Sequence, residues 1–299
     1  MKIIIWGYPL HSHTHSYIHS AFYKSFKYLG YETYWFHDED YPKDFDYNDC
    51  VFITEGYADK NIPLLKSSTY LVHVCHNPKK YLGNVKRLVD IRYYLDFIDD
   101  VNYRYKLDKS KCEELDLGVL YEKNSLDYEV LYMAWGTNLL PEEINLEWAE
   151  EKKSNTYYFI GSLNENVNDI RIFAKKCFEN GVDFVHIDPW RNPVSEEDNI
   201  ILTRKSFMSP DFRHSKHKKW GYIACRLMKS ISYGHLGMTN SLSNKKFIDD
   251  TVVYSENPEE LFYLGMEKMK NIDLIKHQMN IIKTKHTWIN RVNGLERIL

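Results

Sequence analysis

The sequence predicts an α/β protein built of two doubly wound domains that face a cleft. Two apolar runs, 2–6 and 156–160, each end at a glycine and are followed by a helical pattern. Short apolar runs bounded by turn residues are typical of buried parallel strands. A stretch rich in Gly, Asn, Pro and acidic residues between 135 and 151 separates the two halves. Such a stretch is typical of a domain boundary.

In the first half the pattern predicts strands at 2–6, 31–36, 50–54, 70–75, 117–120 and 130–134. A helix is expected over 14–29, because apolar residues recur there at steps of three and four and Gly30 follows. Strand, helix and strand in this order are typical of a βαβ unit with parallel strands. We therefore expect a first domain over 1–145.

The pattern restarts in the second half, with strands expected at 156–160, 182–187, 200–202, 237–239 and 251–254. Helices are expected at 168–180, 222–233, 258–270 and from 274 to the end. Pro258 suits the first position of its helix, where the missing N–H is not needed. We expect a second domain over 146–280 and a closing segment over 281–299.

Composition narrows the class of protein. The 299 residues carry 39 Lys and Arg against 42 Asp and Glu, which speaks against an electrostatic nucleic-acid binder. No apolar run approaches the ~18 residues of a membrane helix. The five cysteines are scattered and show no C-x-x-C spacing. We expect a cytoplasmic protein with no nucleic-acid partner and no integral membrane segment.

Aromatic residues make up 15% of the chain. Alanine is scarce, and most of the rings fall on apolar stripes, so large side chains are expected to fill two small cores. The aromatic content by itself therefore does not indicate a surface for stacking sugars.

The expected helix at 222–233 carries the most chemical information. On a helical wheel one face holds Tyr222, Arg226, Lys229, Ser230 and Tyr233. The helix follows Gly221, and its N-terminal N–H groups favour an anion. Basic residues between 213 and 219 add positive charge. These features favour an anion site over the alternative, a solvated surface helix.

The run GYIACRLMKSISYGHLGMTNS at 221–241 resembles the donor-binding segment of two-domain (GT-B) glycosyltransferases. VVYSENPEELFYLGMEKM at 252–269 resembles the strand and helix that follow it. KHTWINRV at 285–292 resembles the closing helix that crosses back to the first domain, and LYMAWGTN at 131–138 resembles the end of that domain. The resemblance implies two Rossmann-like domains, with the acceptor bound by the first and a nucleoside-diphosphate sugar by the second.

The resemblance also implies the residues that contact the donor. They are Gly161, Ser162, Tyr222, Arg226, Lys229, Asn240 and Ser241. A departing nucleoside diphosphate is an anion, and arginine, lysine and a helix N-terminus can neutralise it without a metal ion. We expect no cofactor beyond the donor substrate, a hexosyl or pentosyl group as cargo, and a glycan or another hydroxyl compound as acceptor.

Four histidines, His11, His13, His15 and His19, lie between the first strand and the first helix. The resemblance implies that one of them deprotonates the acceptor, with inversion at the sugar, and His13 and His15 are the candidates nearest the helix start. A rival hypothesis is a metal-dependent hydrolase that binds its metal through His11, His13 and His15. A third is a catalytically silent module that binds sugar nucleotides, and a polar loop whose histidines only form hydrogen bonds is also open.

Two acidic features are weaker. Glu55 follows the third expected strand, where cleft residues of parallel sheets are found, and is a reserve candidate for the base. Asp44 and Asp46 form a D-x-D string, but Tyr41, Pro42 and Lys43 precede it in place of an apolar strand. We expect this string to be a surface turn.

Overall fold

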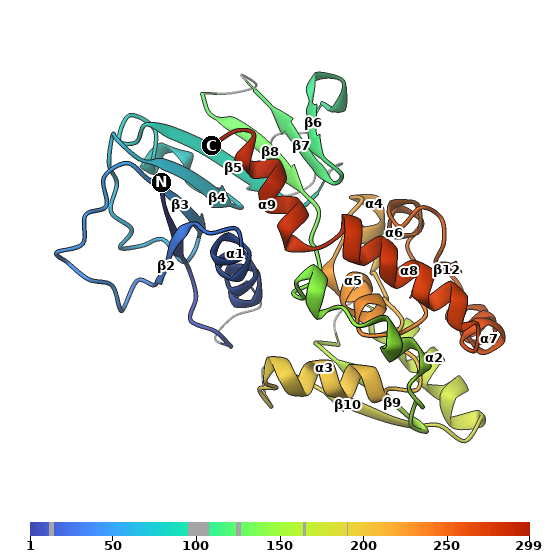
Figure 1. The fold of residues 1–299 in the computed structure, drawn as a ribbon. Helices are drawn as coiled ribbons and strands as arrows, with labels where there is room; N and C mark the ends of the chain where they lie inside the picture. Colours follow the sequence, from blue (N-terminus) through green and yellow to red (C-terminus); the bar gives the residue numbers. More distant parts are fainter. Residues whose placement is uncertain (12–14, 95–107, 124–126, 164–165, 190) are drawn as a thin grey trace. The chain divides into compact units, whose positions relative to one another are not determined.

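The computed structural model describes residues 1–11, 15–94, 108–123, 127–163, 166–189 and 191–299. The chain is of mixed α/β type and divides into two compact units (Figure 1). Unit 1 comprises Met1–Ala134 and Trp288–Leu299, and unit 2 comprises Trp135–Thr287. The sequence placed these divisions at 145 and 280. The C-terminal residues therefore return to the unit in which the chain begins.

Unit 1 contains an eight-stranded, mostly parallel sheet with the order β2-β1-β3-β4-β5-β8-β7-β6. Its strands are β1 (Lys2–Trp6), β2 (Glu32–Phe36), β3 (Cys50–Glu55), β4 (Thr69–His73), β5 (Arg87–Arg92), β6 (Glu113–Asp116), β7 (Val119–Glu122) and β8 (Glu129–Met133). The pairs β6–β7 and β7–β8 are antiparallel, and the other pairs of this sheet are parallel. The chain starts in β1 and moves outward first to β2 and then, on the other side, to β3. This reversal makes the carboxyl ends of β1 and β3 the topological switch point.

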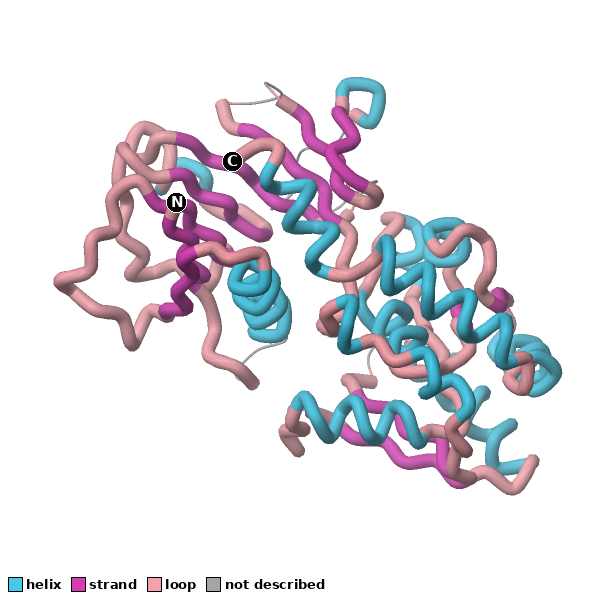
Figure 2. The backbone as a smooth tube through the Cα atoms, in the orientation of Figure 1, coloured by secondary structure: helices cyan, strands magenta, loops and turns pink. Residues whose placement is uncertain are grey.

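The two faces of this sheet are covered differently. Helices α1 (Ser16–Tyr28) and α9 (Trp288–Glu296) pack on one face, where the rings of Phe22 and Trp288 lie 4.8 Å apart (Figure 1). The connections from β2 to β5 contain no α-helix, and all of residues 37–86 are described (Figure 2). Their side chains cover the other face.

That loop-covered face is rich in aromatic rings. Phe52 and Tyr70 stack with centroids 4.6 Å apart, and the loop residues Tyr47 and Tyr81 pack on the same cluster. Large rings fill the space that a helix would occupy in an ordinary doubly wound domain. Much of the aromatic content of the sequence is therefore core, as expected.

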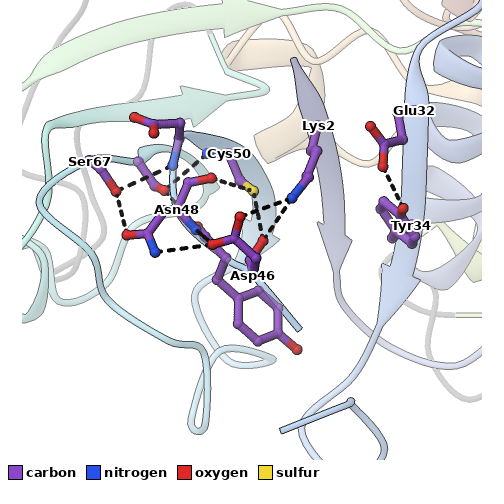
Figure 3. Close-up of polar contacts among 10 residues, drawn as sticks. Lys2, Glu32, Tyr34, Asp46, Asn48, Cys50 and Ser67 are labelled. Carbon is purple, nitrogen blue, oxygen red and sulfur yellow. Dashed lines mark hydrogen bonds and ion pairs between the residues drawn. The ribbon is translucent and has the colours of Figure 1, made fainter. Parts of the chain in front are cut away.

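Polar contacts fasten the loops at the amino ends of the strands (Figure 3). The Lys2 ammonium lies 3.3 Å from the Asp46 carboxylate, which also accepts the backbone N–H of Asn48. The hydroxyl of Ser67 donates to Oδ1 of Asn48. The string at Asp44 and Asp46 is thus a surface turn, as expected from the residues before it. It lies at the end of the sheet opposite the switch point.

Unit 2 contains the parallel pair β9 (Thr156–Ile160) and β10 (Asp183–Ile187) and the parallel pair β11 (Met238–Thr239) and β12 (Val253–Tyr254). The segment 206–211 lies between the pairs. The Phe207 N–H donates to the Thr156 carbonyl, and the Asp211 N–H donates to the Met238 carbonyl. The resulting order, β10, β9, 206–211, β11 and β12, reverses beside β9. The carboxyl ends of β9 and 206–211 form the switch point of unit 2.

The helices of unit 2 are α2 (Val167–Glu179), α3 (Glu196–Lys205), α4 (Ser215–Lys219), α5 (Cys225–Ser232), α6 (Leu242–Phe247), α7 (Pro258–Lys268) and α8 (Ile272–Lys285). The prediction of a strand at 200–202 was wrong, since these residues belong to α3. The Ser195 hydroxyl caps that helix by accepting the Asp198 N–H, and three acidic residues occupy its first turn. A capping serine and early acidic residues both stabilise a helix start.

Two helix boundaries also differ from expectation. The last helix is two helices, α8 and α9, because Thr287 pairs with Thr137 in an isolated parallel bridge between them. The helix expected from 222 begins only at Cys225, after Ala224 in an extended conformation. Within the described ranges, none of the helices is long and apolar enough to cross a membrane.

Unit 2 buries a histidine that makes its stability depend on pH. His235 is 3% exposed, and its Nε2 contacts the Thr203 carbonyl. Burial lowers the pKa of His235 to about 3, and burial also lowers the pKa of His217 to about 3. The unfolded chain takes up these protons near pH 6.5, so stability is lost as pH falls below that value.

We expect each histidine to remove about 1.4 kcal/mol from the free energy of unfolding per pH unit between pH 6 and pH 4. In His235→Gln the side-chain amide can still donate to Thr203, but it does not titrate. Urea unfolding at pH 6, 5 and 4 should therefore give the variant about two thirds of the wild-type slope, because His217 and the buried His73 still take up protons on unfolding. Identical slopes would show that His235 is not the group responsible.

Candidate functional site

In unit 1, polar side chains gather at the carboxyl ends of four neighbouring strands, beside the start of α1. We call this group the histidine site. Its members are Tyr8, His15, His19, Glu55, His73 and Tyr93. It lies at the switch point of the sheet, where doubly wound folds bind their ligands.

The centre of the histidine site is a pair formed by His15 and Glu55. His15 immediately precedes α1, and its Nδ1 lies 3.7 Å from Oε1 of Glu55, the last residue of β3. The His15 side chain is 21% exposed, whereas that of Glu55 is 2% exposed. A partly exposed imidazole thus lies over a buried carboxylate.

The environment keeps the buried carboxylate ionised. Burial alone would raise the pKa of Glu55, but contacts with His15, the Tyr57 N–H and the Tyr8 hydroxyl hold it below its usual value. The N–H of Tyr57 donates to Oε2 at 3.2 Å. A carboxylate that contacts one imidazole nitrogen orients the ring and stabilises its protonated form.

Two further histidines lie deeper and act as packing groups. Burial lowers the pKa of His73 well below its usual value, so this ring is neutral, and its Nδ1 contacts the Tyr93 hydroxyl. His19 lies on α1, and its Nδ1 accepts the Tyr8 N–H at 3.2 Å. A Cβ on Gly7 would lie 2.1 Å from the His19 ring. Any larger residue at position 7 would therefore clash with this ring.

Backbone strain is stored next to Glu55. Val74 follows β4 with φ of 53°, a left-handed conformation that is rare for a β-branched residue. Gly56 follows Glu55, and a Cβ on it would lie 2.4 Å from the Val74 carbonyl oxygen. The loops after β3 and β4 therefore approach each other closely. Strain of this kind persists where surrounding structure enforces it, commonly at functional sites.

The remaining histidines of the cluster are His11 and His13. His13, an expected base, lies outside the described residues. His11 is exposed, and its Nδ1 lies 3.3 Å from the Tyr17 hydroxyl. Among the residues that the structure describes, no three His, Cys, Asp or Glu side chains come together as a metal site.

In unit 2, Gly161, Arg213, Arg226 and Asn240 follow successive strands or begin the adjoining helix, and we call them the arginine site. Arg226 lies in the first turn of α5, and its Nη2 donates to the Ile160 carbonyl at 2.8 Å. A Cβ on Gly161 would lie 2.3 Å from the same Nη2. Two positions expected to bind the donor, 161 and 226, are therefore in direct contact.

Arg213 joins this group through the segment 206–211. Its Nη2 lies 2.6 Å from Oδ1 of Asp211, and its side chain is 12% exposed. Asn240 holds the backbone at this point, because its Oδ1 accepts the Arg213 N–H and its Nδ2 donates to the Arg213 carbonyl and to Asp169. Asn240 thus positions Arg213 at the switch point.

The two guanidinium groups leave the arginine site positively charged. Burial lowers the pKa of Arg226, and the neighbouring charge of Arg213 lowers it further, by more than Asp211 raises it. Positive charge at Arg226 is therefore not fully balanced by the carboxylate. Buried charge of one sign is costly unless an opposite charge joins it, so this arrangement suits an anionic ligand.

Of the residues expected on one helical face with Arg226, Lys229 lies on that face and Tyr222 does not. Because α5 begins at Cys225, Tyr222 lies before the helix, and its ring packs against Trp135 at 5.8 Å and His217 at 4.5 Å. Its ring also lies 6.0 Å from the Arg213 guanidinium carbon. Lys229 follows Arg226 by three residues on α5.

Part of the face expected to be polar is buried. Ser230 is 2% exposed and Tyr233 is 1% exposed. The Ser230 hydroxyl lies 2.7 Å from that of Ser209, so it stabilises the core. The alternative of a solvated surface helix is thus wrong for this face.

The last two residues that were expected to contact the donor are Ser241 and Ser162. Ser241 caps α6 by accepting the Asn244 N–H, and its own N–H donates to the Thr239 hydroxyl. Those contacts give Ser241 a structural role at the end of β11. Ser162 follows Gly161 directly in the turn after β9 and is half-buried.

No protein-family model matches this chain, and no curated protein sequence matches it. Sequence reasoning did not assign Tyr8, Tyr93 or Asp211 to a site. The available signal was position, since each lies at or directly after a segment that the sheet places at its carboxyl edge.

Proposed function

We propose that the protein is a two-domain glycosyltransferase of the GT-B type, with unit 2 binding a nucleoside-diphosphate sugar and unit 1 activating an acceptor hydroxyl. The observation that carries the proposal is the pair Arg213 and Arg226 beside the glycine turn of unit 2. The return of α9 to unit 1 also agrees with the closing helix that the resemblance at 285–292 implies.

The arginine site suits a diphosphate for three reasons. Its two guanidinium groups carry more positive charge than Asp211 offsets. Gly161 makes room for the Arg226 guanidinium to lie directly against the turn after β9. No side chain caps the eight-residue helix α5 at Ala224, so its first N–H groups can serve a ligand oxygen. Bidentate arginine contacts to phosphate are strong and directional.

The histidine site suits general base catalysis. With Nδ1 of His15 facing Glu55, Nε2 is the nitrogen that would accept the proton of the acceptor hydroxyl. The oxygen then forms a bond to the anomeric carbon while the bond to the diphosphate breaks on the opposite face. The proton stays on His15, stabilised by Glu55, and the diphosphate charge is taken by Arg213 and Arg226. This in-line displacement inverts the sugar, and the scheme uses no metal and no further cofactor.

Nucleoside diphosphates should raise the melting temperature of the protein. Binding to the folded state alone stabilises it by about 2.7 kcal/mol at a ligand concentration 100 times Kd. Melting curves with ADP, GDP, UDP, CDP and dTDP at millimolar concentration would identify the base that binds. A flat response to all five would remove the donor site from the proposal.

The same nucleotide then separates an enzyme from a silent module. An enzyme releases the nucleoside diphosphate from its sugar donor when acceptor is present, whereas a binding module shows the melting shift without release. Stoichiometric metal in the purified protein, together with hydrolysis that a chelator stops, would instead favour the metal-dependent hydrolase.

A further inference from the structure

The histidine site includes two residues, His73 and Tyr93, to which the proposed reaction gives no role. Glu55 and His73 are paired in register at the ends of β3 and β4, and Tyr93 directly follows the next strand, β5 (Figure 1). Two positions earlier on these strands lie three fully buried aliphatic residues, Ile53, Leu71 and Ile91. Residues two apart on a strand point to the same face. This face of the sheet therefore changes from apolar to polar in one layer at its carboxyl edge.

Tyr93 contacts both His73 and His15. Its hydroxyl contacts Nδ1 of His73, and the two rings lie 5.2 Å apart at 32°. The centre of the His15 ring lies 6.0 Å from that of Tyr93 at 65°, an edge-to-face arrangement. Tyr93 is 4% exposed, so its surroundings hold it in place. The His15 ring is thus bounded by the Glu55 carboxylate and by the Tyr93 ring.

The carboxylate by itself fixes the His15 ring only weakly. The distance of 3.7 Å between Nδ1 of His15 and Oε1 of Glu55 is longer than that of a hydrogen bond. At this distance the attraction depends mainly on charge and little on the angle of the ring. The orientation of the imidazole must therefore also come from the residue that packs against it, which is Tyr93.

His73 packs against Phe22, whose ring centre lies 5.4 Å away, but packing alone does not require an imidazole there. His73 is fully buried, and within the part of the chain that the structure describes its Nε2 has no hydrogen-bond partner. A buried polar nitrogen without a partner costs free energy, which an apolar ring would not. What the imidazole adds is Nδ1, which holds the Tyr93 hydroxyl.

We propose that Tyr93, held by His73, is a positioning residue that keeps the His15 ring with Nδ1 towards Glu55. In this orientation Nε2 keeps its lone pair for the acceptor hydroxyl. The effect of Tyr93 on turnover rests on the proposed function, whereas its effect on the His15 ring does not. The two effects are measured separately.

NMR of the full-length chain labelled with ¹⁵N-histidine tests the ring directly, and His15→Ala identifies the His15 signals. At about pH 9, where an ordinary imidazole is neutral, we expect His15 to carry its proton on Nδ1, facing Glu55. Free histidine prefers the proton on Nε2. Tyr93→Phe removes the hydroxyl and Tyr93→Leu removes the ring, so the proton should shift towards Nε2, more in Tyr93→Leu. His73→Phe should resemble Tyr93→Phe.

Turnover gives the second measurement. Tyr93→Phe should lower the release of nucleoside diphosphate about 10-fold, because a small misplacement of a reacting group is costly, and should leave the nucleotide affinity unchanged. Since Tyr93 acts through His15, the substitution should cause no further loss in a His15→Ala background. Tyr70→Phe is the matched control, because it removes a buried hydroxyl that contacts Pro63 on the loop-covered face. It should lower stability and keep both the His15 proton position and turnover.

Three results would overturn the positioning role. One is a proton on Nε2 of His15 in the wild-type protein, and another is a proton position that no Tyr93 variant changes. The third is an equal loss of turnover from Tyr93→Phe with and without His15. If the wild-type chain releases no nucleoside diphosphate from any sugar nucleotide, the proposed function fails, and the NMR result still decides whether Tyr93 positions His15.

Discussion

Replacing His15 with alanine is expected to lower turnover by about 10²- to 10⁴-fold, the usual contribution of a general base. The imidazole is the group of the His15–Glu55 pair that is partly exposed, so it is the one an acceptor hydroxyl can reach. The affinity for the nucleoside diphosphate should stay close to the wild-type value, because the arginine site belongs to unit 2. Release of nucleoside diphosphate and calorimetric binding measure the two quantities separately.

The matched control is His277→Ala, which removes an exposed histidine from α8 and should change neither quantity. Glu55→Gln keeps a hydrogen-bond acceptor for the Tyr57 N–H and removes the negative charge. Its turnover should fall between those of wild type and His15→Ala, since the oriented imidazole remains but its protonated form loses stabilisation. If His15→Ala kept wild-type turnover, His15 would not be the base, and His13 would remain as the predicted candidate.

Three of the strands predicted in unit 1 are buried on both faces of the sheet. The strands β1, β3 and β4 appear as apolar runs, because parallel strands covered on two sides need few polar residues. The strand β5 was missed, since Arg87, Asp90 and Arg92 interrupt its apolar pattern. In the structure Arg92 pairs with Asp90 at 2.7 Å, a contact that periodicity does not report.

The contacts within the arginine site could not be predicted from periodicity either. Gly161 and Arg226 were each expected near the donor. The hydrogen bond from Arg226 to Ile160, which brings them together, spans 66 residues and depends on the order of strands in unit 2. Arg213 was noted only as part of a basic stretch. Its place follows from the segment 206–211, whose serines and proline give no strand pattern although it lies in the sheet.

The pairing of His15 with Glu55 also comes from topology. His15 directly precedes α1 and Glu55 ends β3, and β2 separates these two elements in the sequence. They meet because β3 lies directly beside β1, on the side opposite β2. Sequence reasoning named both as candidate bases without joining them. The sheet order brings the two residues together, and the proposed function makes His15 the base and Glu55 the carboxylate that orients it.

Arg226→Ala should have opposite effects on ligand affinity and on the stability of the free protein. Removing a buried group that contacts a phosphate costs at least about 2 kcal/mol, so the affinity for nucleoside diphosphate should fall about 30-fold or more. Without ligand, the substitution loses the contact with Ile160 but relieves the repulsion from Arg213. The free energy of unfolding should therefore change little. Calorimetry and urea unfolding of the same sample test the two parts.

Three comparison variants sharpen this prediction. Arg226→Lys keeps the charge without the fork and should bind with intermediate affinity. Gly161→Ala places a methyl group against Nη2 at φ of 148° and should weaken nucleotide binding while also lowering stability, because both the side chain and the backbone are strained. Arg204 lies on α3 and pairs with Glu151. Arg204→Ala breaks this ion pair and should leave the nucleotide affinity unchanged. Asp211 pairs directly with Arg213, which leaves Arg226 as the guanidinium available to a phosphate. If Arg226→Ala bound the nucleotide with wild-type affinity, Arg226 would be excluded from the donor site.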